Sequence, residues 1–246
     1  MPFGEQPDYY FPLASTAAFV GPNLTAVAGV TFTTVGELVG DGCAVVDGVV
    51  GSYLTTPAVS PALWTGDISH GGYLWVNYDV LADAELVVFR NDAGNAVWEV
   101  WLVNTKAGGR KFNFAPNNLG GGDSVTTTVN LTGTEGTWLF VGWSYNATTD
   151  VMTLVVGKAG VLTTDTGSLA GGTTLQPGGT IRLGGYTTGS TDGKLGPIAM
   201  WSGYAPTAAD FTYAFNGGIG IALTETPGTR GWLAQPGSQG WLAGGM

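Results

Sequence analysis

The sequence is poor in cysteine, histidine and charged residues. Its 246 residues include one cysteine and one histidine, and only 11% are charged. Cys43 cannot form an internal disulfide, and its apolar setting, DGCAVVDG, predicts a buried structural thiol. Basic residues are rare, 8 against 18 acidic ones, so the formal net charge is −10. Because such a surface repels phosphate backbones and anionic lipids, we expect no nucleic-acid partner and no membrane partner.

Long apolar runs are missing as well. No segment approaches the roughly 20 apolar residues that a membrane-spanning helix needs. The first residues, MPFGEQPDYYFPLAS, lack the basic stretch and apolar core of a secretory signal. We therefore expect synthesis in a cytosol, and secretion is the alternative.

Compact motifs of catalytic or metal sites are also absent. The sequence has no CxxC, HExxH, P-loop, EF-hand or GxSxG pattern. We expect His70, in DISHGGY, to be a structural histidine at a strand entrance rather than a general base. A retaining β-glucanase carries Glu-x-Asp-x-x-Glu on one strand, whereas Glu85 and Glu99 are followed by LVVFR and VWLVN. These absences predict that the protein is not an enzyme, and a divergent glycan hydrolase or lyase is a remote alternative.

Glycine, aromatic and β-branched residues are abundant. The 42 Gly, 9 Trp, 10 Phe and 9 Tyr are typical of many short strands joined by tight turns. Runs of strand length are separated by turn sequences such as NLGGGD and QPGG. These runs are 73–80, 85–89, 96–104, 110–114, 124–132, 137–146, 151–157 and 180–185. The pattern predicts an all-β fold, a two-sheet antiparallel jelly-roll sandwich.

Two of these runs carry more detailed predictions. In 124–132, apolar and polar residues alternate from Val125 to Leu131, which is typical of a half-buried antiparallel strand. The run 96–104 is apolar on both faces, which fits either the centre of a sandwich or a surface covered by a partner.

One short helix is predicted near residues 207–216. Thr207 is a suitable N-cap, and Asp210, three residues later, completes a pair that resembles a capping box. Gly217 offers the left-handed residue at which a helix ends.

The C-terminal segment 221–246 is predicted to be an extended Gly- and Pro-rich arm that follows a jelly-roll domain over 1–220. Within the arm the unit GWLA occurs twice, nine residues apart. Its large apolar residues are Trp232, Leu233, Trp241 and Leu242. Because these side chains would be costly in water, we expect the arm to dock, either on a neighbouring molecule or on its own sandwich.

The order of these segments resembles the laminin-G-like branch of the concanavalin A-like lectin/glucanase jelly rolls. The segments that carry the resemblance are Tyr10-Phe11-Pro12-Leu13, Asp47-Gly48, Tyr53-Leu54, Trp138 through Gly157, Leu183-Gly184-Gly185, Gly196 through Trp201, and Asn216-Gly217-Gly218. Together they cover roughly residues 8 to 218. The sequence departs from the family at Pro197, where members often carry Asp or Glu, and this proline predicts an edge or bulged position.

The resemblance implies a calcium site and a glycan site as open expectations. Such domains often hold calcium between loops, and the loop acids that could converge are Asp41, Asp47, Asp67, Asp123 and Asp192. Scattered surface acids are the simpler interpretation, so we expect no cofactor and assign no metal ligand. Most tryptophans lie in strand-like runs, where we expect them in the core. The loop residue Trp64, in PALWTGD, is the best candidate for glycan contact.

Jelly rolls of this class also occur in bacteriophage virions as head decoration, head fibre and tail-associated proteins. Together with the arm and the missing catalytic motifs, the resemblance implies a non-enzymatic structural or decoration component of a virion. Its expected partners are other copies of itself, a capsid or tail protein, and a surface glycan. The alternative is a free carbohydrate-binding module or lectin.

Overall fold

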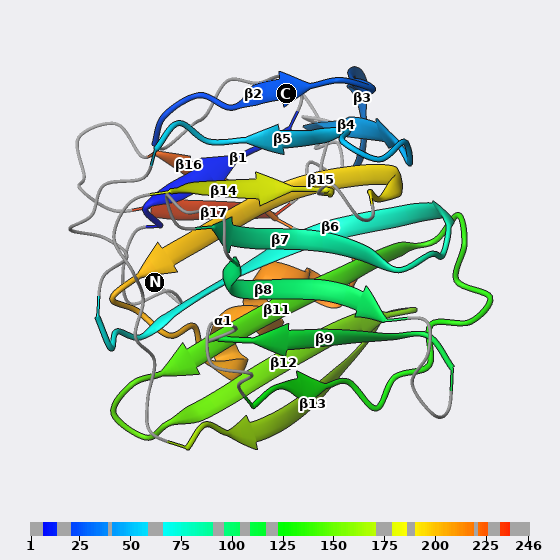
Figure 1. Cartoon of the computed structure of the whole chain (residues 1–246). Coiled ribbons are helices and arrows are strands. Elements are labelled where there is room, and N and C mark those ends of the chain that lie inside the picture. The colour runs from blue at the N-terminus through cyan, green and yellow to red at the C-terminus, as the bar shows by residue number, and fades with distance from the viewer. Residues whose placement is uncertain are drawn as a thin grey trace, which may run out of the picture.

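Two antiparallel sheets lie face to face in the computed structural model (Figure 1), as the strand pattern predicts. The structure describes residues 7–13, 21–38, 41–58, 66–90, 96–103, 109–116, 123–170, 179–185, 190–218, 221–225 and 232–236. The two sheets confirm the predicted all-β jelly-roll sandwich. Within the described ranges no helix is long and apolar enough to cross a bilayer.

We name the two sheets A and B. Sheet A runs in the order β13 (Val161–Ser168), β12 (Val151–Lys158), β11 (Trp138–Asn146), β6 (His70–Val80), β15 (Asp192–Ser202), β4 (Asp41–Asp47) and β3 (Val30–Leu38), and β1 (Tyr9–Phe11) also pairs with β15. Sheet B runs in the order β10 (Val125–Thr126), β9 (Lys111–Ala115), β8 (Ala96–Val103), β7 (Ala84–Arg90), β14 (Thr180–Leu183), β5 (Tyr53–Thr55) and β2 (Thr25–Val27). Many neighbouring strands are distant in sequence, as in a jelly roll.

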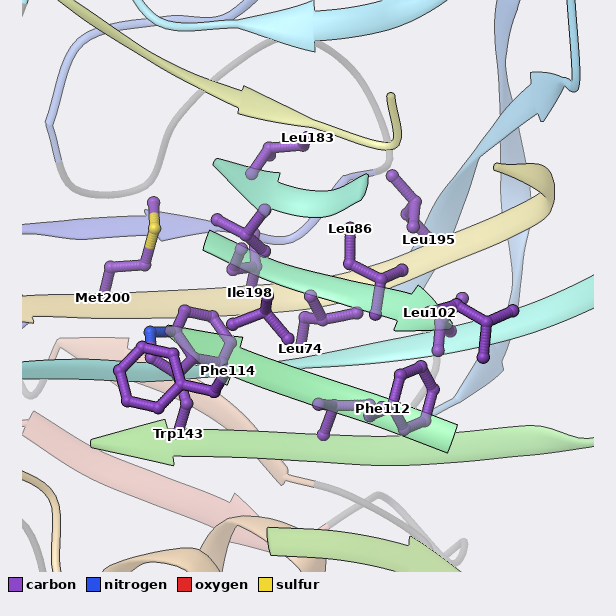
Figure 2. Packing of buried hydrophobic residues seen from close by; sticks show 14 of the residues in the cluster. Leu74, Leu86, Leu102, Phe112, Phe114, Trp143, Leu183, Leu195, Ile198 and Met200 are labelled. Carbon is purple, nitrogen blue, oxygen red and sulfur yellow. The ribbon is translucent and has the colours of Figure 1, made fainter. Parts of the chain in front are cut away.

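The main core fills the space between the sheets (Figure 2). Leucine, isoleucine and aromatic side chains from both sheets meet there, among them Leu74, Leu86, Phe112, Trp143 and Ile198. All five are at most 2% exposed. Since each such side chain contributes about 1.5–3 kcal/mol when buried, this layer is the main source of stability.

Helix α1 (Ala208–Phe215) packs on the outer face of sheet A. Phe211 and Phe215 of this helix pack on an aromatic cluster that includes Phe140 of β11. Glycines allow the close approach: a Cβ on Gly142 would lie 2.6 Å from the Phe211 ring, and one on Gly157 would lie 2.5 Å from the Phe215 ring. The helix therefore occupies one outer face of the sandwich.

The caps of α1 confirm the helix predicted near 207–216. Thr207 is the N-cap, and its side chain and that of Asp210 bond each other's backbone N–H groups in a capping box. The buried Asp210 carboxylate also accepts a hydrogen bond of 2.7 Å from the Tyr204 hydroxyl. The left-handed end begins one residue earlier than expected, at Asn216 with φ 46°, and Gly217 continues it with φ 66°.

The prediction of a strand over 124–132 was wrong in extent. Only Val125 and Thr126 form a strand, although burial still alternates as far as Leu131. The Thr127 N–H still donates to the Phe112 carbonyl of β9 (3.0 Å), but the next N–H, that of Thr128, donates to the Asp165 carboxylate (2.8 Å). The same carboxylate accepts a hydrogen bond from the Thr127 hydroxyl (3.0 Å), so the regular ladder ends here. The other seven predicted runs overlap strands. Strand β13 was not among the predicted runs. It lies at the edge of sheet A, where its mostly polar residues are exposed or only partly buried.

Pro197 lies at a bulge, which is one of the two settings that the sequence predicts for it. The register between β15 and β6 shifts between Leu195 and Ile198, so the proline is not needed as a donor in a regular ladder. Strand β15 lies inside sheet A, which excludes the edge position.

In the predicted arm, the structure describes a hairpin of β16 (Ile221–Glu225) and β17 (Trp232–Pro236). The hairpin forms a two-stranded sheet of its own. Trp232 and Leu233 lie on β17, whereas the other two apolar candidates of the arm, Trp241 and Leu242, lie outside the described residues. The backbone is therefore extended where it is described, but it folds back on itself.

Candidate functional site

A cavity of about 270 Å³ lies on the outer face of sheet B, over β7 and β8. Its lining residues are Asp83, Ala84, Glu85, Glu99, Trp101, Leu102 and Val103. On β8 the core-facing Val100 and Leu102 alternate with the half-buried Glu99, Trp101 and Val103, so the latter three project outward. No helix covers this face in the part of the chain that the structure describes.

Strand register brings the cavity's aromatic and acidic groups together. Trp101 of β8 lies opposite Glu85 of β7, and such cross-strand partners have Cβ atoms about 4.5–5.5 Å apart. A bulge between Glu85 and Val87 shifts the register, so that Leu86 and Val87 both reach the core while Glu85 faces outward. Glu99 precedes Trp101 by two residues and shares its face.

The two glutamates lie in a desolvated, negatively charged setting. Burial raises the pKa of Glu99 to about 7, and the negative charge of Glu85 adds to the rise, whereas Arg90 opposes it. Burial also raises the pKa of Glu85, and Arg90 and Arg182 partly offset that rise. The Glu85 carboxylate accepts a 2.9 Å ion-pair bond from Arg90 through Oε1. Its Oε2 atom is buried and has no hydrogen-bond partner within the described ranges.

A second aromatic group lies farther along the same sheet. The Arg182 guanidinium carbon of β14 is 4.9 Å from the centroid of the Tyr53 ring of β5. Arg182 lies between Val88 of β7 and Thr55 of β5 in the sheet register. The outer face of sheet B thus carries aromatic rings beside charged hydrogen-bonding groups.

The tryptophans confirm the expectation that most strand aromatics are structural. Trp98 and Trp143 lie in the main core, and Trp75 and Trp201 lie in the cluster beneath α1. Trp64, the predicted glycan contact, lies outside the described residues. The half-buried Trp101 instead lines the outer cavity, and sequence reasoning did not single it out. A glutamate two residues before it, inside an otherwise apolar run, is the signal that could have marked this face as outward.

Glu85 and Glu99 were considered in the sequence only as parts of a single-strand glucanase motif, and that motif is absent. The structure places them instead on neighbouring strands, facing the same cavity. The pairing depends on the register between β7 and β8, which the spacing of acidic residues along one strand does not reveal.

His70 and Cys43 are both buried. His70 packs against Trp98 and Tyr145, with ring centroids 5.5 and 5.7 Å away, and burial lowers its pKa to about 3. It therefore stays neutral at ordinary pH, which fits the structural role expected from the sequence. Cys43 is 1% exposed and its sulfur lies 3.1 Å from the Thr33 hydroxyl, so the prediction of a buried thiol is confirmed.

The predicted calcium candidates do not converge on one point. Asp47 and Asp192 lie opposite each other on β4 and β15. Asp67 accepts a hydrogen bond from a tyrosine hydroxyl, and Asp123 accepts one from a backbone N–H. The side chain of Asp41 is not described. Among the residues placed in the structure, no group of three His, Cys, Asp or Glu is arranged to hold a metal ion.

Comparison with known proteins finds similarity in structure but not in sequence. No protein-family model matches the chain, and no curated protein does. Domain 4 of an extracellular arabinanase from Geobacillus stearothermophilus, in complex with arabinotriose, aligns with a TM-score of 0.57 at 14% identity, over 84% of this chain and 97% of that domain. A Trypanosoma rangeli sialidase aligns with a TM-score of 0.56 at 10% identity, over 86% of this chain and 33% of the sialidase.

The binding domain of botulinum neurotoxin serotype D also aligns, with a TM-score of 0.52 at 14% identity, over 79% of this chain and 47% of that one. At such identities the similarity shows the fold alone. The fold that this chain shares with these domains is a two-sheet antiparallel jelly-roll sandwich, the architecture that the sequence resemblance implies.

Proposed function

We propose that this chain is a non-enzymatic carbohydrate-binding domain whose sugar site is the cavity on the outer face of sheet B. The observation that carries the proposal is the arrangement of Trp101 beside two carboxylates in a cavity of about 270 Å³. Binding sites for small ligands combine an apolar or aromatic surface with a few converging polar groups.

The chemistry of the cavity suits a sugar ring. The Trp101 indole offers a flat apolar surface for the C–H face of the ring, while carboxylate oxygens accept hydrogen bonds from hydroxyl groups. The arabinotriose in the structure of the similar arabinanase domain also supports a sugar ligand.

The ion pair of Glu85 favours binding over hydrolysis. A retaining glycosidase needs one free carboxylate as nucleophile and a second carboxyl group as acid. Here Arg90 pairs with Glu85 at 2.9 Å, so one of the two carboxylates is already engaged. We therefore propose that the site binds sugars without cleaving them.

A binding titration with matched tryptophan variants tests this proposal. We expect neutral and amino-sugar oligosaccharides to bind the intact chain in calorimetry, and Trp101→Ala to weaken binding at least tenfold. Trp138→Ala is the control, because Trp138 is also half-buried but packs against the cluster beneath α1. Circular dichroism checks that both variants fold. Equal binding by Trp101→Ala, absence of binding to any oligosaccharide, or release of shorter sugars would refute the proposal.

A second proposal concerns residues 221–246, which we assign to assembly. The hairpin β16–β17 pairs with neither sheet A nor sheet B. Strand β16 contacts α1 of the same domain. A two-stranded hairpin is nevertheless marginally stable in water, so a further surface that covers it is expected. We propose that this surface belongs to another copy of the chain or to a capsid or tail protein, and that the chain serves as a virion decoration component with its sugar site facing outward.

Light scattering of the full chain and of a version ending at Gly220 tests the assembly proposal. The full chain is expected to self-associate or to bind its partner, whereas the shortened chain stays monomeric with unchanged thermal stability. Two monomers of equal stability would refute self-assembly through residues 221–246.

A further inference from the structure

The cavity on sheet B is negatively charged. Three of its lining residues are acidic, Asp83, Glu85 and Glu99, and none is basic. Arg90, on the same strand as Glu85, pairs with that carboxylate and also lowers the pKa of Glu99, but its side chain is only 9% exposed and it does not line the cavity. A ligand in the cavity therefore meets an excess of negative charge.

The aromatic group of the cavity favours a cation as well. The face of a tryptophan ring attracts cations, and indole is the strongest of the aromatic side chains in this respect. Trp101 lies opposite Glu85 and two residues from Glu99, so a group held against the ring also lies near both carboxylates. An ammonium group has three donors and fits this combination, whereas a carboxylate fits none of it.

Glu99 would gain from such a ligand. It ionises reluctantly because it is desolvated and lies near Glu85. Glu85 is already paired with Arg90 through Oε1, and its Oε2 atom is buried. A bound ammonium would favour the ionised form of Glu99 and pair with it, which a neutral hydroxyl does only in part.

We infer that the cavity beside Trp101 selects sugars that carry a free amine, of the glucosamine type, over neutral sugars, and that it rejects acidic sugars. The inference rests on the proposed sugar site and adds the class of sugar. The volume of the cavity, about 270 Å³, agrees with this inference. It is near the lower end of the usual range for ligand pockets and suits a short oligosaccharide segment rather than a large ligand.

A series of tetramers that differ in charge tests the inference. Calorimetry at pH 6.5 would compare β-1,4-linked tetramers of glucosamine, of N-acetylglucosamine and of glucose with a uronic-acid tetramer. The glucosamine tetramer is expected to bind at least tenfold more tightly than the glucose tetramer, and the uronic-acid tetramer is expected not to bind. The preference should shrink when the salt concentration is raised from 50 to 300 mM, because salt screens charge.

Matched glutamine variants separate a specific site from general attraction to an acidic protein. Glu99→Gln keeps the shape of the side chain and should reduce the preference for glucosamine at least fivefold. Glu135→Gln should leave it unchanged, because Glu135 pairs with Arg110 and does not line the cavity. Urea denaturation confirms that both variants are folded.

The possible failures of the two proposals are distinguishable. If the glucose or uronic-acid tetramer binds as tightly as the glucosamine tetramer, the inference is overturned while the sugar site stands. If the preference for glucosamine survives in Glu99→Gln, it arises from the overall charge of the protein and the inference is again overturned. If no tetramer binds, the proposed function itself fails.

Discussion

Replacing Glu99 with glutamine should stabilise the protein at pH 8 and leave it nearly unchanged at pH 4.5. Glu99 is an acid whose pKa in the folded protein, about 7, lies above the ordinary glutamate value of 4.5. Between these two values the folded state holds a proton that the unfolded state has released. The favourable contribution of the protonated carboxyl is therefore complete below about pH 4.5 and is lost as the pH rises through 7.

The size of the effect follows from the shift in pKa. One unit corresponds to about 1.36 kcal/mol, so the rise from 4.5 to about 7 gives at most about 3 kcal/mol at pH 8. Glutamine has no charge to desolvate, so this cost disappears in the variant. Glu85 shifts in the same direction, and losing its charged neighbour adds to the gain.

Urea denaturation of the two proteins between pH 4.5 and 8.5 measures this difference. The original protein should lose stability relative to Glu99→Gln as the pH rises, with most of the change between about pH 4.5 and 7. Glu135→Gln serves as the control, since the partly exposed ion pair of Glu135 with Arg110 should contribute less than about 1 kcal/mol. A variant that is no more stable than the original at pH 8 would show that Glu99 is not buried beside Glu85.

Three further changes test the packing of the sandwich. Gly157→Val should destabilise the protein by about 1–3 kcal/mol in urea denaturation, because the new side chain meets the Phe215 ring, and near-neutral behaviour would show that α1 does not rest on β12. Thr207→Ala should cost about 1 kcal/mol by removing the cap that Asp210 shares, and an unchanged melting temperature would contradict the capping box. Trp143→Ala should cost about 3–5 kcal/mol in the same assay, since Trp143 is fully buried between the sheets, and a loss below 1 kcal/mol would place it elsewhere.

Local features of the fold could be predicted because neighbouring residues determine them. The capping box of α1 depends on Thr207 and Asp210, which are three residues apart. The bulge in β15 follows from the missing N–H of Pro197. The strand expected over 124–132 was wrong in extent because Asp165, distant in sequence, bonds Thr127 and the Thr128 backbone.

The candidate site could not be predicted because it depends on pairing between strands. Glu85 and Trp101 face each other only through the register of β7 and β8, and the bulge at Glu85 sets that register. A search for acidic residues spaced along one strand does not find such a pair. The position of Trp101 in an apolar run also made it resemble the core tryptophans Trp98 and Trp143.

Nuclear magnetic resonance of the indole N–H signals tests the central claim most directly. Nine tryptophans give nine signals at most, and Trp101→Phe assigns the one of interest. During titration with the glucosamine tetramer, the Trp101 signal should move while those of the buried Trp98 and Trp143 stay in place. Binding that leaves the Trp101 signal unmoved, or no change in any signal, would contradict a sugar site on sheet B.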